Sequence, residues 1–98
     1  MARYDVYRLK DGGLVVDLQA DLLSDLTTRV VAPLLPLDGY LKPASNLNPL
    51  FNVDGEKYML GVQFLAAIPI REMQDGVCSV SSDEQLILKS IDMLFSGF

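Results

Sequence analysis

Residues 81–98, SSDEQLILKSIDMLFSGF, decide the expected fold, because they predict one helix with a defined start. Ser81 with Glu84, and Ser82 with Gln85, make two overlapping capping boxes, in which side chains satisfy the unpaired backbone N–H groups of the first turn. The acidic residues at the start also suit the positive end of the helix dipole. The sequence therefore predicts a single capped helix that begins at Ser81 and runs almost to the last residue.

The two faces of this helix are unequal. Polar residues recur at i, i+4, i+7 and i+11 and form one narrow stripe, made of Gln85, Lys89, Asp92 and Ser96. Apolar side chains fill most of the remaining circumference, roughly twice the ~100° arc that a helix needs to lie on one sheet. One sheet cannot cover an apolar arc this wide, so the sequence predicts a second surface that covers the rest of it. A twofold homodimer would supply this surface most simply. Phe95 and Phe98 are either core residues or part of such a contact surface.

Upstream of the helix the sequence predicts about six short strands with turn signals between them. The turns at residues 11–13 (DGG) and at Asp54-Gly55 favour two hairpins, 4–9 with 14–19 and 50–53 with 57–64. Residues 66–73 (AAIPIREM) are expected to form a further strand, and residues 38–49 form the longest irregular segment.

Residues 29–37 (RVVAPLLPL) are apolar but contain Pro33 and Pro36. Proline cannot donate a ladder hydrogen bond, so this segment is expected to be an edge strand or a strand interrupted by a bulge. The expected fold class is α+β and mainly antiparallel, a small sheet or barrel with a C-terminal helix packed on it. Residues 1–98 are expected to form one domain.

Residues 20–28 (ADLLSDLTT) have no clean periodicity, and leucines lie among turn-forming Asp and Ser residues. The segment is either a short helical turn packed on the sheet or an exposed binding loop. Asp17, Asp21 and Asp25 recur every four residues, but Asp17 falls in an expected strand, so helical spacing does not apply. These three carboxylates are expected to be solvated or capping groups rather than a metal site.

The composition excludes several kinds of chemistry. The chain has no histidine and one cysteine, Cys78, which excludes His-based catalysis, an internal disulfide and a cysteine metal cluster. Cys78 is expected to be a partly buried residue without chemistry. No cofactor and no metal are expected.

The net charge and the hydropathy of the chain limit the classes of partner that we expect. The net charge is −5 and the eight Lys and Arg residues are scattered, so direct nucleic-acid binding is not expected. No apolar run approaches the ~18–20 residues of a membrane helix, and the amino terminus lacks the pattern of a signal peptide. A cytoplasmic location without a membrane partner is therefore expected.

Five segments, in the same order, resemble the CcdB family of bacterial toxins. Residues 14–34 (LVVDLQADLLSDLTTRVVAPL) are similar to the family's Val-Asp-Val-Gln strand, its aliphatic loop and its Val-x-Pro-Leu strand. Residues 81–98 resemble the family's terminal helix, which closes in Met-Phe-Trp-Gly-Ile. Between these blocks, residues 48–50 (NPL), 54–56 (DGE) and 67–70 (AIPI) follow the family pattern. The resemblance covers nearly the whole chain apart from a gap in the first hairpin.

The resemblance implies a dimeric small barrel or sheet of the kind found in CcdB, Kid and MazF toxins, with a C-terminal helix. It implies the toxin of a type II toxin–antitoxin module, which binds the A subunit of DNA gyrase, traps the cleaved-DNA complex and is neutralised by a CcdA-like antitoxin. Such a toxin has no catalytic residues, so the chain is expected not to be an enzyme. Carried over by position, the implied gyrase contacts are Ser96, Gly97, Phe98, Phe95, Asp92, Leu22 and Leu23.

Ser96 departs from the family, which has tryptophan at this position. A tryptophan that stacks on a partner's arginine can contribute ~2 kcal/mol or more, and serine contributes none of this. One alternative is therefore a CcdB-like paralogue with lost or altered gyrase binding. Another is a MazF- or Kid-like endoribonuclease in which Arg29 with Asp21 or Asp25 acts near a phosphate, although the acidity of the chain argues against it.

Overall fold

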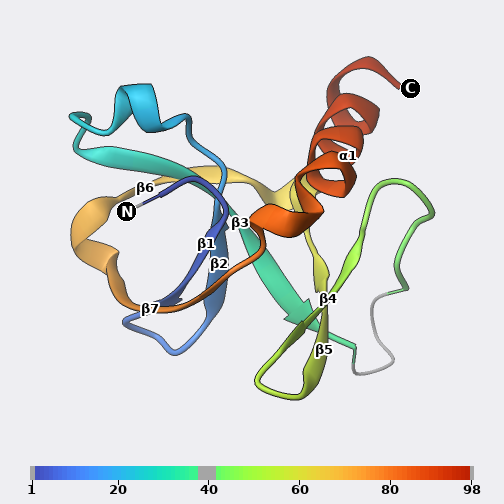
Figure 1. Ribbon diagram of the computed structural model, residues 1–98, viewed down its shortest axis with the longest axis horizontal. Helices are drawn as coiled ribbons and strands as arrows, with labels where there is room; N and C mark the ends of the chain where they lie inside the picture. Colours follow the sequence, from blue (N-terminus) through green and yellow to red (C-terminus); the bar gives the residue numbers. More distant parts are fainter. Residues whose placement is uncertain (1, 38–41, 98) are drawn as a thin grey trace.

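A curved antiparallel sheet with one C-terminal α-helix makes up the fold (Figure 1). The computed structural model describes residues 2–37 and 42–97. Within these ranges the strands are β1 (Asp5–Leu9), β2 (Leu14–Asp17), β3 (Thr28–Pro36), β4 (Leu50–Val53), β5 (Glu56–Leu60), β6 (Ala66–Pro69) and β7 (Met73–Ser79), and the helix is α1 (Glu84–Ser96). The strand order is β4-β5-β3-β2-β1-β7, with β6 also paired to β3. The predicted fold class is confirmed.

Short 3₁₀ turns connect several of these elements. They are η1 (Asp21–Leu23), η2 (Val62–Phe64), η3 (Ile70–Glu72) and η4 (Ser81–Asp83). Figure 1 shows that β6, η3 and β7 bring the chain round from β3 to β1, so that one part of the sheet closes into a half-barrel. The predicted strand at residues 66–73 is therefore only half right, because β6 stops at Pro69 and β7 is a separate strand that the sequence analysis missed.

Both predicted hairpins are present. β1 pairs antiparallel with β2, and β4 pairs antiparallel with β5. Asp54 and Gly55, which join β4 to β5, have φ angles of 51° and 83°, as a two-residue type I′ turn requires. Two strands are shorter than predicted, since β2 ends at Asp17 and β5 ends at Leu60, before η2.

β3 is a central strand, and the prediction of an edge or bulged strand is wrong. It pairs with β2 on one side, and with β6 and then β5 on the other. β6 pairs with residues 28–31 of β3 and β5 with residues 34–36, so Pro33 lies where the partner changes. The Pro33 carbonyl accepts the Gly61 N–H at 2.8 Å. Because N and O of one strand residue point to the same side, the missing N–H of Pro33 faces this gap and no ladder bond is lost.

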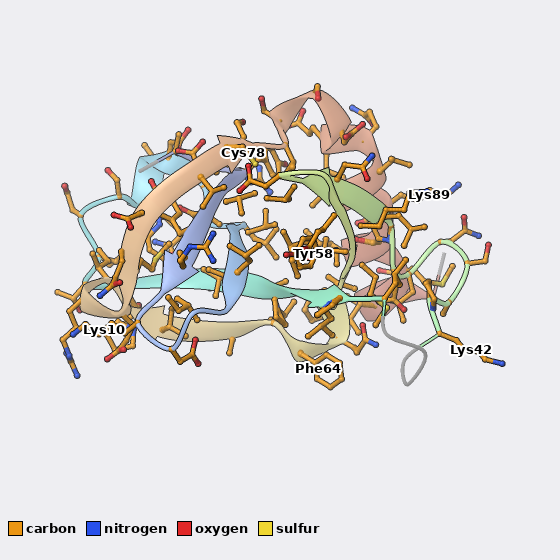
Figure 2. The ribbon with its side chains drawn as sticks, turned by 90° about the horizontal axis from the view of Figure 1, so that it is seen from below. Lys10, Lys42, Tyr58, Phe64, Cys78 and Lys89 are labelled. Atoms are coloured by element: carbon orange, nitrogen blue, oxygen red, sulfur yellow. The ribbon has the colours of Figure 1, made fainter. Side chains whose placement is uncertain are left out.

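The two faces of the sheet carry separate apolar cores, and β2 contributes to both. On one face, Val16 packs with buried residues of neighbouring strands and with Ile87 of α1, and Tyr58 points into this interior (Figure 2). On the other face, Val15 packs with Val31 and Met73 inside the half-barrel. Alternate residues of a strand point to opposite faces, which explains why all four residues of β2 are buried.

α1 begins at Glu84, and the two predicted capping boxes are wrong. Residues 81–83 form η4 instead, and the helix has no side-chain cap at its N-terminus. Ser81 is engaged with Ser79, whose hydroxyl oxygen accepts the Ser81 N–H at 3.2 Å. The helix ends at Ser96, and Gly97 follows in the left-handed conformation with φ of 77°, where glycine is the favoured residue.

The predicted imbalance of the helix faces is confirmed. Ile87 and Ser90 are fully buried, and the predicted polar stripe is exposed. Apolar surface remains uncovered on both flanks of the buried face, because Leu86 is 49% and Phe95 is 70% exposed. Phe95 is thus a surface residue and not a core residue, whereas Phe98 lies outside the described residues. The homodimer that would cover this surface stays a prediction.

Candidate protein-binding site

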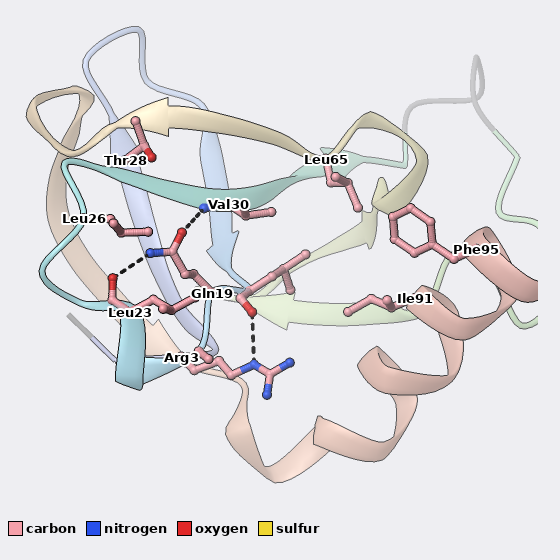
Figure 3. Close-up of a pocket in the computed structure, with 11 residues that line it drawn as sticks. Arg3, Gln19, Leu23, Leu26, Thr28, Val30, Leu65, Ile91 and Phe95 are labelled. Atoms are coloured by element: carbon pink, nitrogen blue, oxygen red, sulfur yellow. Dashed lines mark hydrogen bonds between the residues drawn. The ribbon is translucent and has the colours of Figure 1, made fainter.

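A groove of about 590 Å³ lies between the loop that precedes β3 and the outer flank of α1 (Figure 3). We call residues 20–27 the aliphatic loop, and this depression the loop–helix groove. Its apolar lining includes Leu23 and Leu26 from the loop, Leu65 after η2, and Ile91 and Phe95 from α1. A volume of this size lies within the ~300–1,000 Å³ of typical ligand pockets, so the groove can accept side chains of another molecule.

Three of the predicted contact residues lie at or beside this groove. Leu23 and Phe95 lie on opposite walls, and Leu22, 92% exposed, is the neighbour of Leu23 in η1. Asp92 and Ser96 are exposed on α1 but do not line the groove. The structure therefore brings Leu23 and Phe95 together.

The two remaining predicted contacts are Gly97 and Phe98. Gly97, which caps α1, is exposed and is absent from the lining. Phe98 falls outside the described ranges, so its predicted role as an aromatic contact stays a prediction.

The aliphatic loop is a short helical turn, but it is not packed on the sheet. Its turn bonds are internal: the N–H of Leu23 donates to the Ala20 carbonyl at 3.0 Å, and that of Leu26 to the Leu23 carbonyl at 3.2 Å. Every side chain from residue 20 to residue 27 is exposed. Each of the two predicted alternatives is therefore right in part: the segment is helical, and it is exposed.

The polar side chains that line the groove belong to Arg3, Gln19 and Thr28. The Arg3 Nε donates to the Leu18 carbonyl at 3.0 Å, and its backbone N–H donates to Asp21 Oδ1 at 2.8 Å. Gln19 spans the base of the aliphatic loop (Figure 3). The sequence analysis missed Arg3, Gln19 and Leu65, because their places at the groove depend on contacts that form only in the folded chain.

Asp17 and Arg29 form a fully buried ion pair beneath the loop. Arg29 Nη2 lies 2.6 Å and Nε 3.0 Å from Asp17 Oδ2. The prediction of a solvated Asp17 is wrong, because the register of β2 on β3 sets Asp17 opposite Val31, on the same face as Arg29. The nomination of Arg29 with Asp21 or Asp25 for phosphate chemistry is also wrong, since Arg29 is enclosed with Asp17 and both other carboxylates lie on the exposed loop.

The described residues offer few other groups that could bind a metal or act as a nucleophile. In the described ranges, no three His, Cys, Asp or Glu residues come together as a possible metal site. Cys78 is exposed on β7 and not partly buried as predicted (Figure 2). Partial desolvation raises the pKa of its thiol, as do the Asp54 and Asp5 carboxylates, and a protonated thiol is a poor nucleophile.

Three of the lysines in the described part of the chain do not lie in one cluster. Figure 2 shows Lys10 at one end of the molecule and Lys42 and Lys89 toward the other. No helix in the described part of the chain is long and apolar enough to cross a membrane.

The comparison with protein families shows to which family this chain is related. The family model described as "CcdB protein" matches residues 3–97. The chain belongs to the CcdB family. Among solved structures, the Mycobacterium tuberculosis toxin MazF-mt6 is similar, with a TM-score of 0.74, 17% identity and 93% of each chain covered. At this identity the likeness shows a shared fold.

No curated protein sequence matches the chain. Membership of the CcdB family, together with a fold shared with a MazF toxin, supports the role of a toxin in a toxin–antitoxin system.

Proposed function

We propose that this CcdB family member binds the A subunit of DNA gyrase and traps the enzyme with its DNA cleaved, and that a CcdA-like antitoxin neutralises it. One observation carries the proposal: Leu23 and Phe95, two positions at which the family resemblance implies gyrase contacts, line the same groove, one from the aliphatic loop and the other from α1. The protein acts by binding and not as an enzyme. This agrees with the enclosure of Arg29, which leaves the nominated catalytic pair without access to a substrate.

The energetics of the exposed side chains support a protein partner. Leu22 and Phe95 are 92% and 70% exposed, and burial of such a side chain contributes about 1.5–3 kcal/mol. Scattered exposed leucines are ordinary, but apolar side chains gathered at a groove are typical of an interaction site. In this proposal the ring of Phe95 supplies aromatic contact area that Ser96 lacks.

The test is a gyrase cleavage assay with purified protein. Wild type is expected to accumulate cleaved DNA, and Phe95→Ala and Leu22→Ala are each expected to need about tenfold more protein, as for loss of a modest hot spot. Leu50→Ala is the matched control, because Leu50 is an exposed leucine on β4 that lines neither the groove nor the flanks of α1. Wild type that traps nothing at high micromolar concentration would contradict gyrase poisoning and favour a paralogue with another target.

Purified protein incubated with single-stranded RNA tests the enzymatic alternative. No cleavage is expected. Specific cleavage would overturn the proposal that the protein acts only by binding.

The protein is also proposed to form a homodimer through one of the two exposed flanks of α1. Light scattering at micromolar concentration is expected to give twice the mass of one chain. Leu86→Glu and Phe95→Glu place a charge on one flank each, so the variant that lowers the mass identifies the dimer surface. A monomer mass for wild type would contradict the dimer.

A further inference from the structure

We infer that Gln19 is a positioning residue, which holds the aliphatic loop in the shape that presents Leu22 and Leu23 to the partner. The inference rests on the proposed use of this loop in binding. Gln19 itself does not need to touch the partner, because it is only 7% exposed. Its effect is transmitted through hydrogen bonds to the loop.

The side-chain amide of Gln19 joins the loop to the sheet. Its Nε2 donates to the carbonyl of Leu23 at 3.0 Å, and its Oε1 accepts the backbone N–H of Val30 in β3 at 3.1 Å (Figure 3). One bond therefore ends on the residue that forms a wall of the groove, and the other on a central strand. An amide that donates at one end and accepts at the other satisfies both backbone groups.

The backbone of Gln19 is anchored in turn by the buried ion pair. Its N–H donates to Asp17 Oδ1 at 3.0 Å, and its carbonyl accepts Arg29 Nη2 at 3.4 Å. Polar contacts thus run without a break from the interior of the half-barrel to Leu23. A side chain held at its backbone and at both ends of its amide has little freedom to move.

Few other contacts could replace this tether. No loop side chain from residue 20 to residue 27 is buried. The described loop meets the rest of the chain at Asp21, which accepts the exposed Arg3 N–H, and at Thr27, whose carbonyl accepts the Ile70 N–H at 3.0 Å. Without the Gln19 bond, the Leu23 carbonyl would keep only the N–H of Leu26, which belongs to the loop itself, and the partner would have to order the loop on binding.

Two variants remove the tether in different ways. Gln19→Met keeps the length of the side chain but loses both bonds, and leaves the Val30 N–H unpaired. Gln19→Glu, at a pH at which the carboxyl group is ionised, keeps an acceptor for Val30 and replaces the donor to Leu23 with a second acceptor. Glu therefore breaks the loop tether even if the loss of the Val30 bond makes Met fold poorly. Ser24→Ala, in the same loop but away from the tether, is the control.

Hydrogen exchange provides a test that needs no partner. In both Gln19 variants, the backbone amides of Leu23 and Leu26 are expected to exchange about tenfold faster than in wild type, because a loop without its tether opens more often. The β1 and β2 amides should keep their wild-type rates, and Ser24→Ala should leave the loop rates unchanged. Unchanged loop exchange in both variants would overturn the inference.

A mutant cycle tests the effect on binding to the gyrase A subunit. Gln19→Glu is expected to weaken binding about tenfold in wild type, but less than about twofold when Leu22 and Leu23 are both alanine, because the residue acts through them. Equal losses in both backgrounds would overturn the positioning role, as would unchanged affinity despite a mobile loop. If wild type does not bind, or the double alanine variant binds normally, the proposed function fails while hydrogen exchange still decides the tether.

Discussion

Asp17→Leu and Arg29→Met are each expected to lower the free energy of unfolding by about 3–5 kcal/mol, because each leaves a buried charge without its partner. Both side chains are fully buried, and their shortest N–O distance is 2.6 Å. A typical domain is stable by only about 5–15 kcal/mol, so either variant is expected to unfold at much lower urea concentration. Urea denaturation followed by circular dichroism measures this loss.

The double variant Asp17→Leu with Arg29→Met shows which loss destabilises the protein. It distinguishes the cost of an unpaired buried charge from the cost of losing the contact between the two side chains. With both charges gone, most of the stability is expected to return, since apolar replacement of a buried ion pair is often neutral or favourable. Arg29 Nη1 strengthens this expectation, because it is buried and has no hydrogen-bond partner among the described residues, and such a group is costly. Asp25→Asn, on the exposed loop, is the control. Single variants that lose less than about 1 kcal/mol would contradict an enclosed, interdependent pair.

Ile87→Ala is expected to destabilise the protein by about 2–5 kcal/mol, because it removes a side chain from the core between α1 and the sheet and leaves a cavity. Ile87 is fully buried and packs in the larger core. Leu86→Ala is the matched control, since Leu86 is the preceding residue and is 49% exposed. Its cost is expected to stay below about 1 kcal/mol. Thermal denaturation at low protein concentration measures both.

The stability losses of Leu86→Ala and Ile87→Ala, measured at several protein concentrations, also test whether the protein forms a dimer. If Leu86→Ala is costly only at high protein concentration, Leu86 is covered by a second copy, because a bound partner stabilises the folded state by mass action. If it costs as much as Ile87→Ala at every concentration, the two faces of α1 do not differ in burial as the structure describes.

The contact residues that the family resemblance implies were named from sequence one by one, but their arrangement was not. The resemblance named Leu23 and Phe95 without any indication that they line the same groove. Gln19 carried little signal of its own, as a polar residue between a strand and a leucine-rich loop. Its role became visible only when its amide was seen to connect Leu23 with Val30.

The errors in the sequence analysis have a common cause. Capping boxes at Ser81 and Ser82, an edge position for β3, and a solvated Asp17 were all inferred from local preference. Tertiary contacts overrode each preference: η4 precedes the helix, β5 and β6 leave a gap opposite Pro33, and Arg29 encloses Asp17. A local rule gives the commonest environment of a residue type, and these residues occupy less common ones.

The sequence by itself determined the hairpins, the C-terminal helix and the uneven faces of that helix. Their causes are local: positive φ at an Asp-Gly turn, alternation along strands, and apolar spacing along one segment. Only the tertiary structure decided which strands flank β3, which carboxylate is buried, and that the aliphatic loop and Phe95 line one groove. These features depend on contacts between residues distant in the chain, whose energies exist only after the sheet has folded and brought them together.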